Sequence, residues 1–117
     1  MSGEAANALF SYGTLRQPEV QLGNYGRLLA GEPDILVGYR LVEIGIGDPE
    51  VIRMSGKAVH TIAVASGDPT DRVEGVVFLI TDLELAATDS YETSAYRRIE
   101  ATLGSGRSAW AYVGDAT

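Results

Sequence analysis

The sequence predicts one small domain, all-β or α+β, in which about six short strands form a strongly curved sheet with one main helix over an end. Three observations lead to this prediction. The chain has 117 residues, of which 45% are hydrophobic, which suits a single folded core. Short apolar runs alternate with turn residues along most of its length. Only one segment carries a strong helix-start signal, so a doubly wound parallel sheet is disfavoured.

Strands are expected where β-branched and aromatic residues cluster or alternate. The expected segments are residues 8–12, 35–44, 59–64, 73–80, 96–103 and 107–113, with a bend at Gly38 in the second and a hairpin between the last two. Residues 1–7 are small and polar and are expected to be frayed, which leaves residues 8–117 as a single domain.

The helical signals are local. Thr81 and Glu84 form a capping box that opens a helix over residues 82–91. One face of that helix is expected to carry Leu83, Ala86, Ala87 and Ser90. Pro18 starts a single helical turn over residues 18–22, and the glycine-rich residues 23–33 are expected to form a surface loop.

The charge balance excludes several partners. Nine Lys and Arg against 16 Asp and Glu give a net charge of −7, which disfavours nucleic acid and anionic membranes. With no cysteine and a single histidine, thiolate zinc sites, iron–sulfur clusters and multi-histidine metal sites are excluded. The sequence shows neither a secretory signal nor a membrane-spanning run, so a cytoplasmic location is expected.

The first candidate site is the segment from Tyr12 to Arg16. Gly13 allows a ligand to approach the backbone closely, and the amides that follow such a bend can form a nest for an anion. The alternative is a plain connection from a strand to a helix. A phosphate-binding P-loop is excluded, because no Lys follows a Gly at the required spacing.

The second candidate is Glu92, at the expected C-terminal end of the helix over residues 82–91. The helix dipole disfavours an anion there, and Asp89 one turn earlier adds repulsion, so both effects would raise the affinity of Glu92 for a proton. An acid in such a position lowers the stability of the fold, which makes it a candidate functional group. The alternative is a solvated glutamate at a helix end. Asp89 itself is interpreted as structural or solvated.

The segment from Phe10 to Arg16 resembles the YGTLR signature of the gamma-glutamylcyclotransferase-like family. Tyr91-Glu92 followed by Tyr96-Arg97-Arg98 is similar to that family's helix-end acid and next strand, and the intervening strands also fit. The resemblance implies a small mixed β-barrel with one main flanking helix. It implies cyclisation of a γ-glutamyl amine or amide to 5-oxoproline with release of the amine, without cofactor.

By the same resemblance, Glu92 matches the acid–base residue, and Tyr96 matches an aromatic residue near it that is expected to bind substrate. Tyr12, Gly13, Thr14 and Leu15 match the loop that holds the glutamyl group, largely through backbone amides. The sequence departs from the family pattern in two places. Thr93-Ser94 stand where many relatives have Gly after the acid, and residues 54–66 lack the Pro-Gly and Gly-Gly pairs that are common in the family. The alternatives are another γ-glutamyl-processing hydrolase and a catalytically silent γ-glutamyl-binding module.

Overall fold

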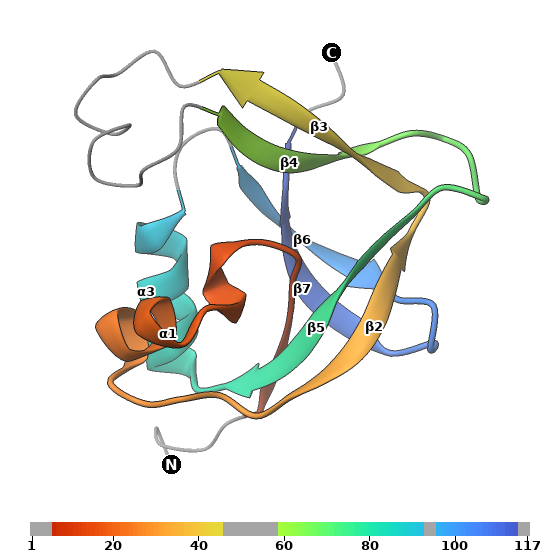
Figure 1. Ribbon diagram of the computed structural model, residues 1–117. Helices are drawn as coiled ribbons and strands as arrows, with labels where there is room; N and C mark the ends of the chain where they lie inside the picture. Colours follow the sequence, from red (N-terminus) through yellow and green to blue (C-terminus); the bar gives the residue numbers. More distant parts are fainter. Residues whose placement is uncertain (1–5, 46–58, 93–95, 115–117) are drawn as a thin grey trace.

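Two sheets make up the fold of the computed structural model, which describes residues 6–45, 59–92 and 96–114. Five strands lie in the order β2-β5-β1-β7-β6, and β3 pairs with β4 (Figure 1). Only β1 and β7 pair in parallel among the described strands. The strands are β1 (Asn7–Ser11), β2 (Gly31–Val37), β3 (Tyr39–Gly45), β4 (Val59–Ala65), β5 (Arg72–Ile80), β6 (Arg97–Thr102) and β7 (Ser108–Val113).

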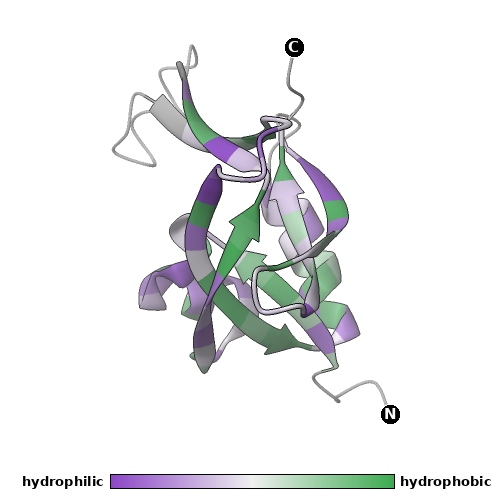
Figure 2. Cartoon of the chain, turned by 90° about the vertical axis from the view of Figure 1, so that its right-hand side faces the viewer, coloured by the Kyte–Doolittle hydropathy of each residue, from purple (hydrophilic) through white to green (hydrophobic). Residues whose placement is uncertain are grey.

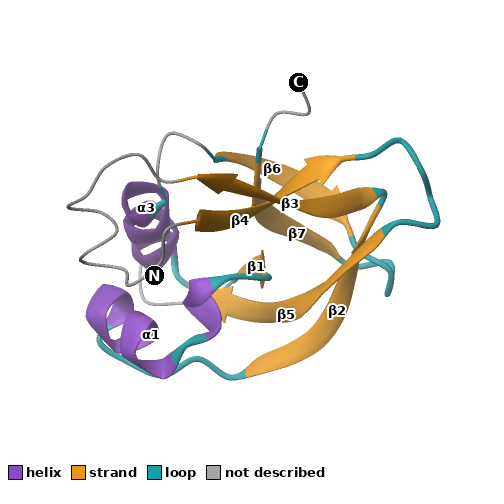
Figure 3. Cartoon of the chain, turned by 45° about the horizontal axis from the view of Figure 1, so that its top comes forward, coloured by secondary structure: helices purple, strands orange, loops and turns teal. Residues whose placement is uncertain are grey.

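The five-stranded sheet curls until its edge strands meet, but it does not close into a barrel within the described residues. Leu36, on β2, and Leu103, just after β6, form one isolated bridge, beside which the Gly104 N–H donates to the Ile35 carbonyl at 2.8 Å. The α+β class is confirmed, whereas the closed barrel is corrected to two curved sheets. A separate pair, β3–β4, covers the top of the larger sheet (Figures 1 and 3).

Gly38 explains why residues 35–44 are not one long strand. It has φ 81°, a left-handed conformation that favours glycine, and it turns the chain out of the five-stranded sheet into β3. Two hydrogen bonds hold the turn, from the Gly38 N–H to the Asp71 carbonyl at 2.8 Å and from the Ser66 N–H to the Gly38 carbonyl at 3.0 Å. The prediction of one bent strand is therefore wrong.

The main helix, α3 (Asp82–Tyr91), has the predicted bounds and the predicted capping box. The Glu84 N–H donates to Thr81 Oγ1 at 3.1 Å, and the Thr81 N–H donates to Glu84 Oε1 at 2.9 Å. The expected apolar face is wrong, because Leu83 is 72% exposed. Leu85 and the buried Thr88 face the protein instead.

A second helix, α1 (Pro18–Tyr25), is longer than the single turn expected, and it ends at Gly26 with φ 69°. Because β2 begins at Gly31, the loop expected over residues 23–33 is reduced to a short connection. None of the described helices is long and apolar enough to span a membrane.

The two helices lie side by side along one flank of the strands (Figures 1 and 3). Two contacts join them: Tyr25 Oη lies 2.6 Å from Thr88 Oγ1, and the Arg27 guanidinium, just after α1, pairs with the Glu84 carboxylate at 2.7 Å. Hydrophobic segments are concentrated on the strands, and hydrophilic ones are interspersed along the outer strands and the helices (Figure 2). The helical layer thus fixes the position of α3 relative to β1 and the turn that follows it.

The first strand begins at Asn7, inside the segment expected to be frayed. β1 pairs with β5 from Asn7 opposite Ile80 to Ser11 opposite Val76. The Asn7 side chain donates to the Ile80 carbonyl at 3.2 Å and to Asp82 Oδ1 at 2.8 Å. These contacts anchor the start of β1, whose other end leads into the first candidate site.

Candidate active site

The turn after β1 leaves two backbone amides available. It forms a short 3-10 helix, η1 (Thr14–Arg16), in which the Arg16 N–H donates to the Gly13 carbonyl at 3.2 Å. Within the described residues, the N–H groups of Thr14 and Leu15 donate to no protein acceptor. Leu15 is buried and packs in a hydrophobic cluster with Leu9 and Phe78. Successive free amides of this kind can bind an anion.

Open space lies beside Gly13. A Cβ atom built on this residue would meet no heavy atom within 4 Å. The Arg16 side chain folds back over the turn and donates through Nε to the Gly13 carbonyl at 3.1 Å. The turn is thus held by its own hydrogen bonds while the side of Gly13 remains open.

Glu92 caps the C-terminal end of α3. Its backbone is extended (φ −71°, ψ 139°), and its N–H donates to the Thr88 carbonyl at 3.0 Å. The side chain is half-buried, and burial raises the pKa of its carboxyl to about 7. The direction agrees with the sequence analysis, but the cause is desolvation by the folded protein rather than the repulsion from Asp89 that was expected.

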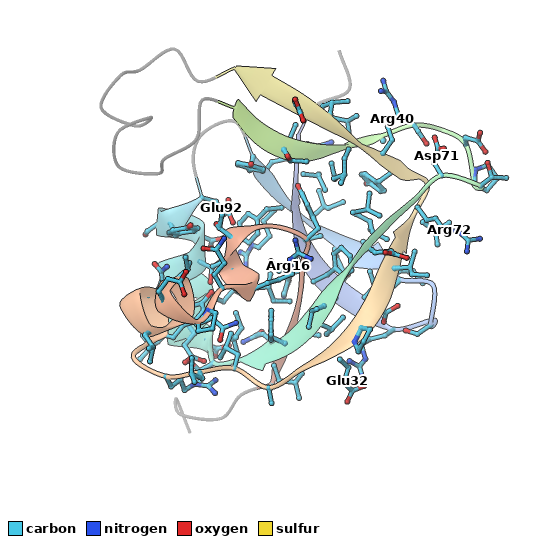
Figure 4. The ribbon with its side chains drawn as sticks, viewed as in Figure 1. Arg16, Glu32, Arg40, Asp71, Arg72 and Glu92 are labelled. Atoms are coloured by element: carbon cyan, nitrogen blue, oxygen red, sulfur yellow. The ribbon has the colours of Figure 1, made fainter. Side chains whose placement is uncertain are left out.

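The two candidate segments, far apart in the sequence, meet in space. Thr14 Oγ1 lies 2.6 Å from Tyr91 Oη, so the turn contacts the residue immediately before Glu92. Figure 4 shows Glu92 at the end of α3, next to η1. One site can therefore combine an acid with a high pKa and free backbone amides.

Four tyrosines from different parts of the chain interact electrostatically with the acid. Burial is the main cause that raises the pKa values of four phenols, those of Tyr12, Tyr25, Tyr96 and Tyr112. The pKa of Tyr96 rises to about 12. The negative charge of Glu92 adds to each of the four shifts. These phenols therefore stay neutral at physiological pH. Glu92 therefore has neutral phenols as neighbours, and burial alone raises its pKa.

The Tyr12 hydroxyl is fully engaged by the protein. It donates to the Tyr112 carbonyl at 2.7 Å and accepts the Ala63 N–H at 3.0 Å, so it joins β7 to β4. Tyr96 reaches the same strand, because its hydroxyl donates to the Thr61 carbonyl at 3.1 Å. Both tyrosines predicted to bind substrate thus also fasten β4 beside the site, a role that the sequence did not reveal.

Tyr12→Phe is expected to lower the free energy of unfolding by about 1–3 kcal/mol, because the buried Ala63 N–H loses its acceptor. Urea denaturation measures the change. Tyr39→Phe is the matched control, since the structure shows no hydrogen bond from the Tyr39 hydroxyl to a described residue. A loss no larger than that of the control would contradict the bridging role of Tyr12.

Other parts of the sequence analysis lie outside this site. Thr93-Ser94 and residues 46–58 are outside the described residues, as is the side chain of His60. Among the described residues, no group of three His, Cys, Asp or Glu side chains could hold a metal ion. A groove of about 750 Å³ runs over the solvent-facing side of β2 and β5 and includes Arg16 and Arg72, but Glu92 does not line it.

A sequence profile of a family described as "Gamma-glutamyl cyclotransferase, AIG2-like" matches residues 9–117. The chain belongs to this family. The resemblance that rested on the turn after β1 and on the end of α3 is thereby confirmed. No curated protein sequence matches the chain significantly.

Solved structures show that the cyclotransferase-family fold is shared. The solution structures of two Arabidopsis thaliana proteins superpose with TM-scores of 0.73 and 0.70, at 23% and 18% identity, over 97% and 95% of this chain. The crystal structure of an uncharacterised Pyrococcus horikoshii protein superposes with a TM-score of 0.61 at 18% identity, over 93% of this chain. The chain spans 65%, 70% and 78% of the lengths of these three proteins.

Proposed function

We propose that this protein is a cofactor-independent γ-glutamylcyclotransferase that converts a γ-glutamyl amine or amide to 5-oxoproline and releases the amine. The observation that carries the proposal is the half-buried Glu92 carboxyl, with a pKa of about 7, beside a turn with two free amides. Family membership supports the same reaction class.

Glu92 is the proposed acid–base residue. The α-amino group of the substrate is an ammonium at neutral pH, and it must lose a proton before it can attack. A carboxyl with a pKa near 7 is partly ionised at neutral pH and can accept that proton. The α-nitrogen then forms a bond to the γ-carbonyl carbon and loses its second proton, and the amide C–N bond breaks. The departing nitrogen takes up both protons, one of them returned by Glu92, and leaves as an ammonium. No water is consumed.

Much of the rate enhancement comes from the geometry of ring closure. The nucleophile belongs to the substrate, so besides moving protons the protein has to fold the glutamyl chain until its two ends meet. Well-oriented intramolecular reactions reach effective molarities of roughly 10⁵–10⁸ M. The open space beside Gly13 is where the folded glutamyl chain would lie.

The amides of Thr14 and Leu15 supply the anion-binding part of the site. They can hold the α-carboxylate of the substrate or the oxyanion that develops on the γ-carbonyl. One well-placed oxyanion donor contributes roughly 10²–10³ in rate. Both roles use fixed backbone donors, which the hydrogen bonds of η1 hold in place.

Product analysis tests the proposal. The protein is incubated with a panel of γ-glutamyl amines, amino acids and isopeptides, and the products are identified by mass. We expect 5-oxoproline and the free amine from at least one substrate. Glutamate, which is one water heavier, would instead identify a hydrolase. Tight γ-glutamyl binding by calorimetry with no product would identify a silent binding module and refute the enzyme.

A further inference from the structure

The last turn of α3 is fastened to three different elements by side chains. Thr88 Oγ1 lies 2.6 Å from Tyr25 Oη on α1. Tyr91 Oη lies 2.6 Å from Thr14 Oγ1 on η1. Asp89 Oδ1 accepts the Tyr112 hydroxyl of β7 at 2.5 Å. Glu92 follows directly, at the end of α3 shown in Figure 4.

Such anchoring is needed at this position. The last turn of a helix lacks part of its backbone hydrogen bonds and frays easily. This turn has no basic residue, and Asp89 places a negative charge where the helix dipole disfavours it. A helix end with these properties keeps a fixed orientation only if tertiary contacts hold it.

Asp89 finds compensating partners on the β6–β7 hairpin. The Arg98 guanidinium of β6 lies 3.3 Å from Asp89 Oδ1 and stacks over the Trp110 ring, with Cζ 4.5 Å from its centroid. Arg98 and Tyr112 are directly opposite in the β6–β7 register. Tyr112 is 6% exposed. Its burial and, to a smaller extent, its hydrogen bond to Asp89 raise the pKa of its phenol, so the hydroxyl remains protonated and can donate a hydrogen bond.

We propose that Tyr112, Asp89 and Arg98 form a positioning network that fixes the last turn of α3 to the β6–β7 hairpin and thereby keeps the Glu92 carboxyl buried beside the turn at Gly13. The three residues act through Glu92 and touch no reacting atom. This inference rests on the proposed function for its kinetic consequence, whereas its structural consequence can be measured independently.

Tyr112→Phe is the most informative variant, because it deletes the hydroxyl and retains both charges of the network. Among the described residues, the phenols of Tyr12, Tyr25, Tyr96 and Tyr112 interact electrostatically with Glu92, and Tyr91 precedes it in the chain. Asp89 and Arg98 are linked to these groups through the Tyr112 hydroxyl. Since no formal charge is removed, a change in the pKa of Glu92 reports a change in its burial.

We expect Tyr112→Phe to lower kcat by about 10- to 100-fold with KM changed less than about twofold, because the base is misplaced while the glutamyl-binding turn is intact. Carboxyl NMR should show the pKa of Glu92 falling from about 7 toward its ordinary value. Exchange of the Glu92 amide, which donates to the Thr88 carbonyl, should become faster. Tyr39→Phe should change none of these quantities.

Arg98→Gln is a second variant, in case Tyr112→Phe does not fold. The Arg98 side chain is 30% exposed, so the substitution is tolerated more easily, and Arg98→Lys should restore part of the loss. The control is Arg107→Gln, which breaks the exposed pair with Glu32 (3.6 Å) at the far end of the hairpin.

An unchanged Glu92 pKa together with unchanged amide exchange in folded Tyr112→Phe and Arg98→Gln proteins would overturn the network. If the wild-type protein forms no 5-oxoproline, the proposed function fails, while the NMR and exchange measurements still decide whether the network holds Glu92. The two failures are therefore distinguishable.

Discussion

Glu92→Gln is expected to lower the turnover of γ-glutamyl amines by about 10²–10⁴-fold, the usual contribution of a positioned acid–base group. The amide has nearly the same shape as the carboxylic acid, but it can neither accept the proton of the α-ammonium nor return it to the leaving nitrogen. Substrate binding should be retained, because the Thr14 and Leu15 amides and the open space beside Gly13 are unchanged. Calorimetry and product analysis measure binding and turnover separately.

The pH profile of the wild-type enzyme should reveal the same group. Only the ionised carboxylate can act as the base, so kcat/KM should rise with pH and level off above a pKa of about 7. Near-native turnover by Glu92→Gln would remove Glu92 from the mechanism. A kcat/KM profile whose acidic limb had the ordinary pKa of a surface glutamate would also remove Glu92 from the mechanism.

The same substitution should make the protein more stable at alkaline pH. In the wild type the Glu92 pKa is about 7 when folded, against an ordinary value of 4.5. Below the ordinary value the carboxyl is protonated in both the folded and the unfolded chain. As the pH rises, the unfolded chain releases its proton first, so wild-type stability falls through this window until the folded pKa is passed. The glutamine side chain of the variant has no proton to lose, so its stability does not fall in this way.

Glu92→Gln should therefore gain about 2–3 kcal/mol of unfolding free energy over the wild type near pH 8, and the gain should shrink toward zero at about pH 4, below the ordinary pKa. Urea denaturation at both pH values measures it. Glu100→Gln is the control, because Glu100 is exposed on β6. A pH-independent difference between Glu92→Gln and the wild type would show that the Glu92 carboxyl is not buried in solution. An acid that destabilises the fold at working pH is a cost expected at a functional site.

Local sequence signals predicted the elements that depend on neighbouring residues. The capping box at Thr81 and Glu84 placed α3 over residues 82–91 correctly, because both of its hydrogen bonds lie within one turn. The turn from Gly104 to Gly106 correctly predicted the β6–β7 hairpin. The segment before Gly13 and the acid at the helix end were likewise singled out from the residues themselves.

Signals that depend on distant residues were missed. No short-range pattern shows that Gly38 takes the chain from one sheet to another, or that α1 continues to Tyr25 because Tyr25 reaches Thr88 on α3. The resemblance matched Tyr12 to the loop that holds the substrate, but it did not show that the Tyr12 hydroxyl bridges β7 and β4. These partners are tens of residues away, so their identity depends on the packing of the whole domain.

By itself, the sequence determined that an acid ends a helix, that a glycine turn ends a strand, and that both match one family. Only the tertiary structure decided that they adjoin, through Thr14 and Tyr91, and that the pKa of Glu92 is high because the folded protein removes its carboxyl from water. The physical reason is that desolvation and hydrogen bonds between segments arise from packing, whereas caps and turns arise from the chain's nearest neighbours.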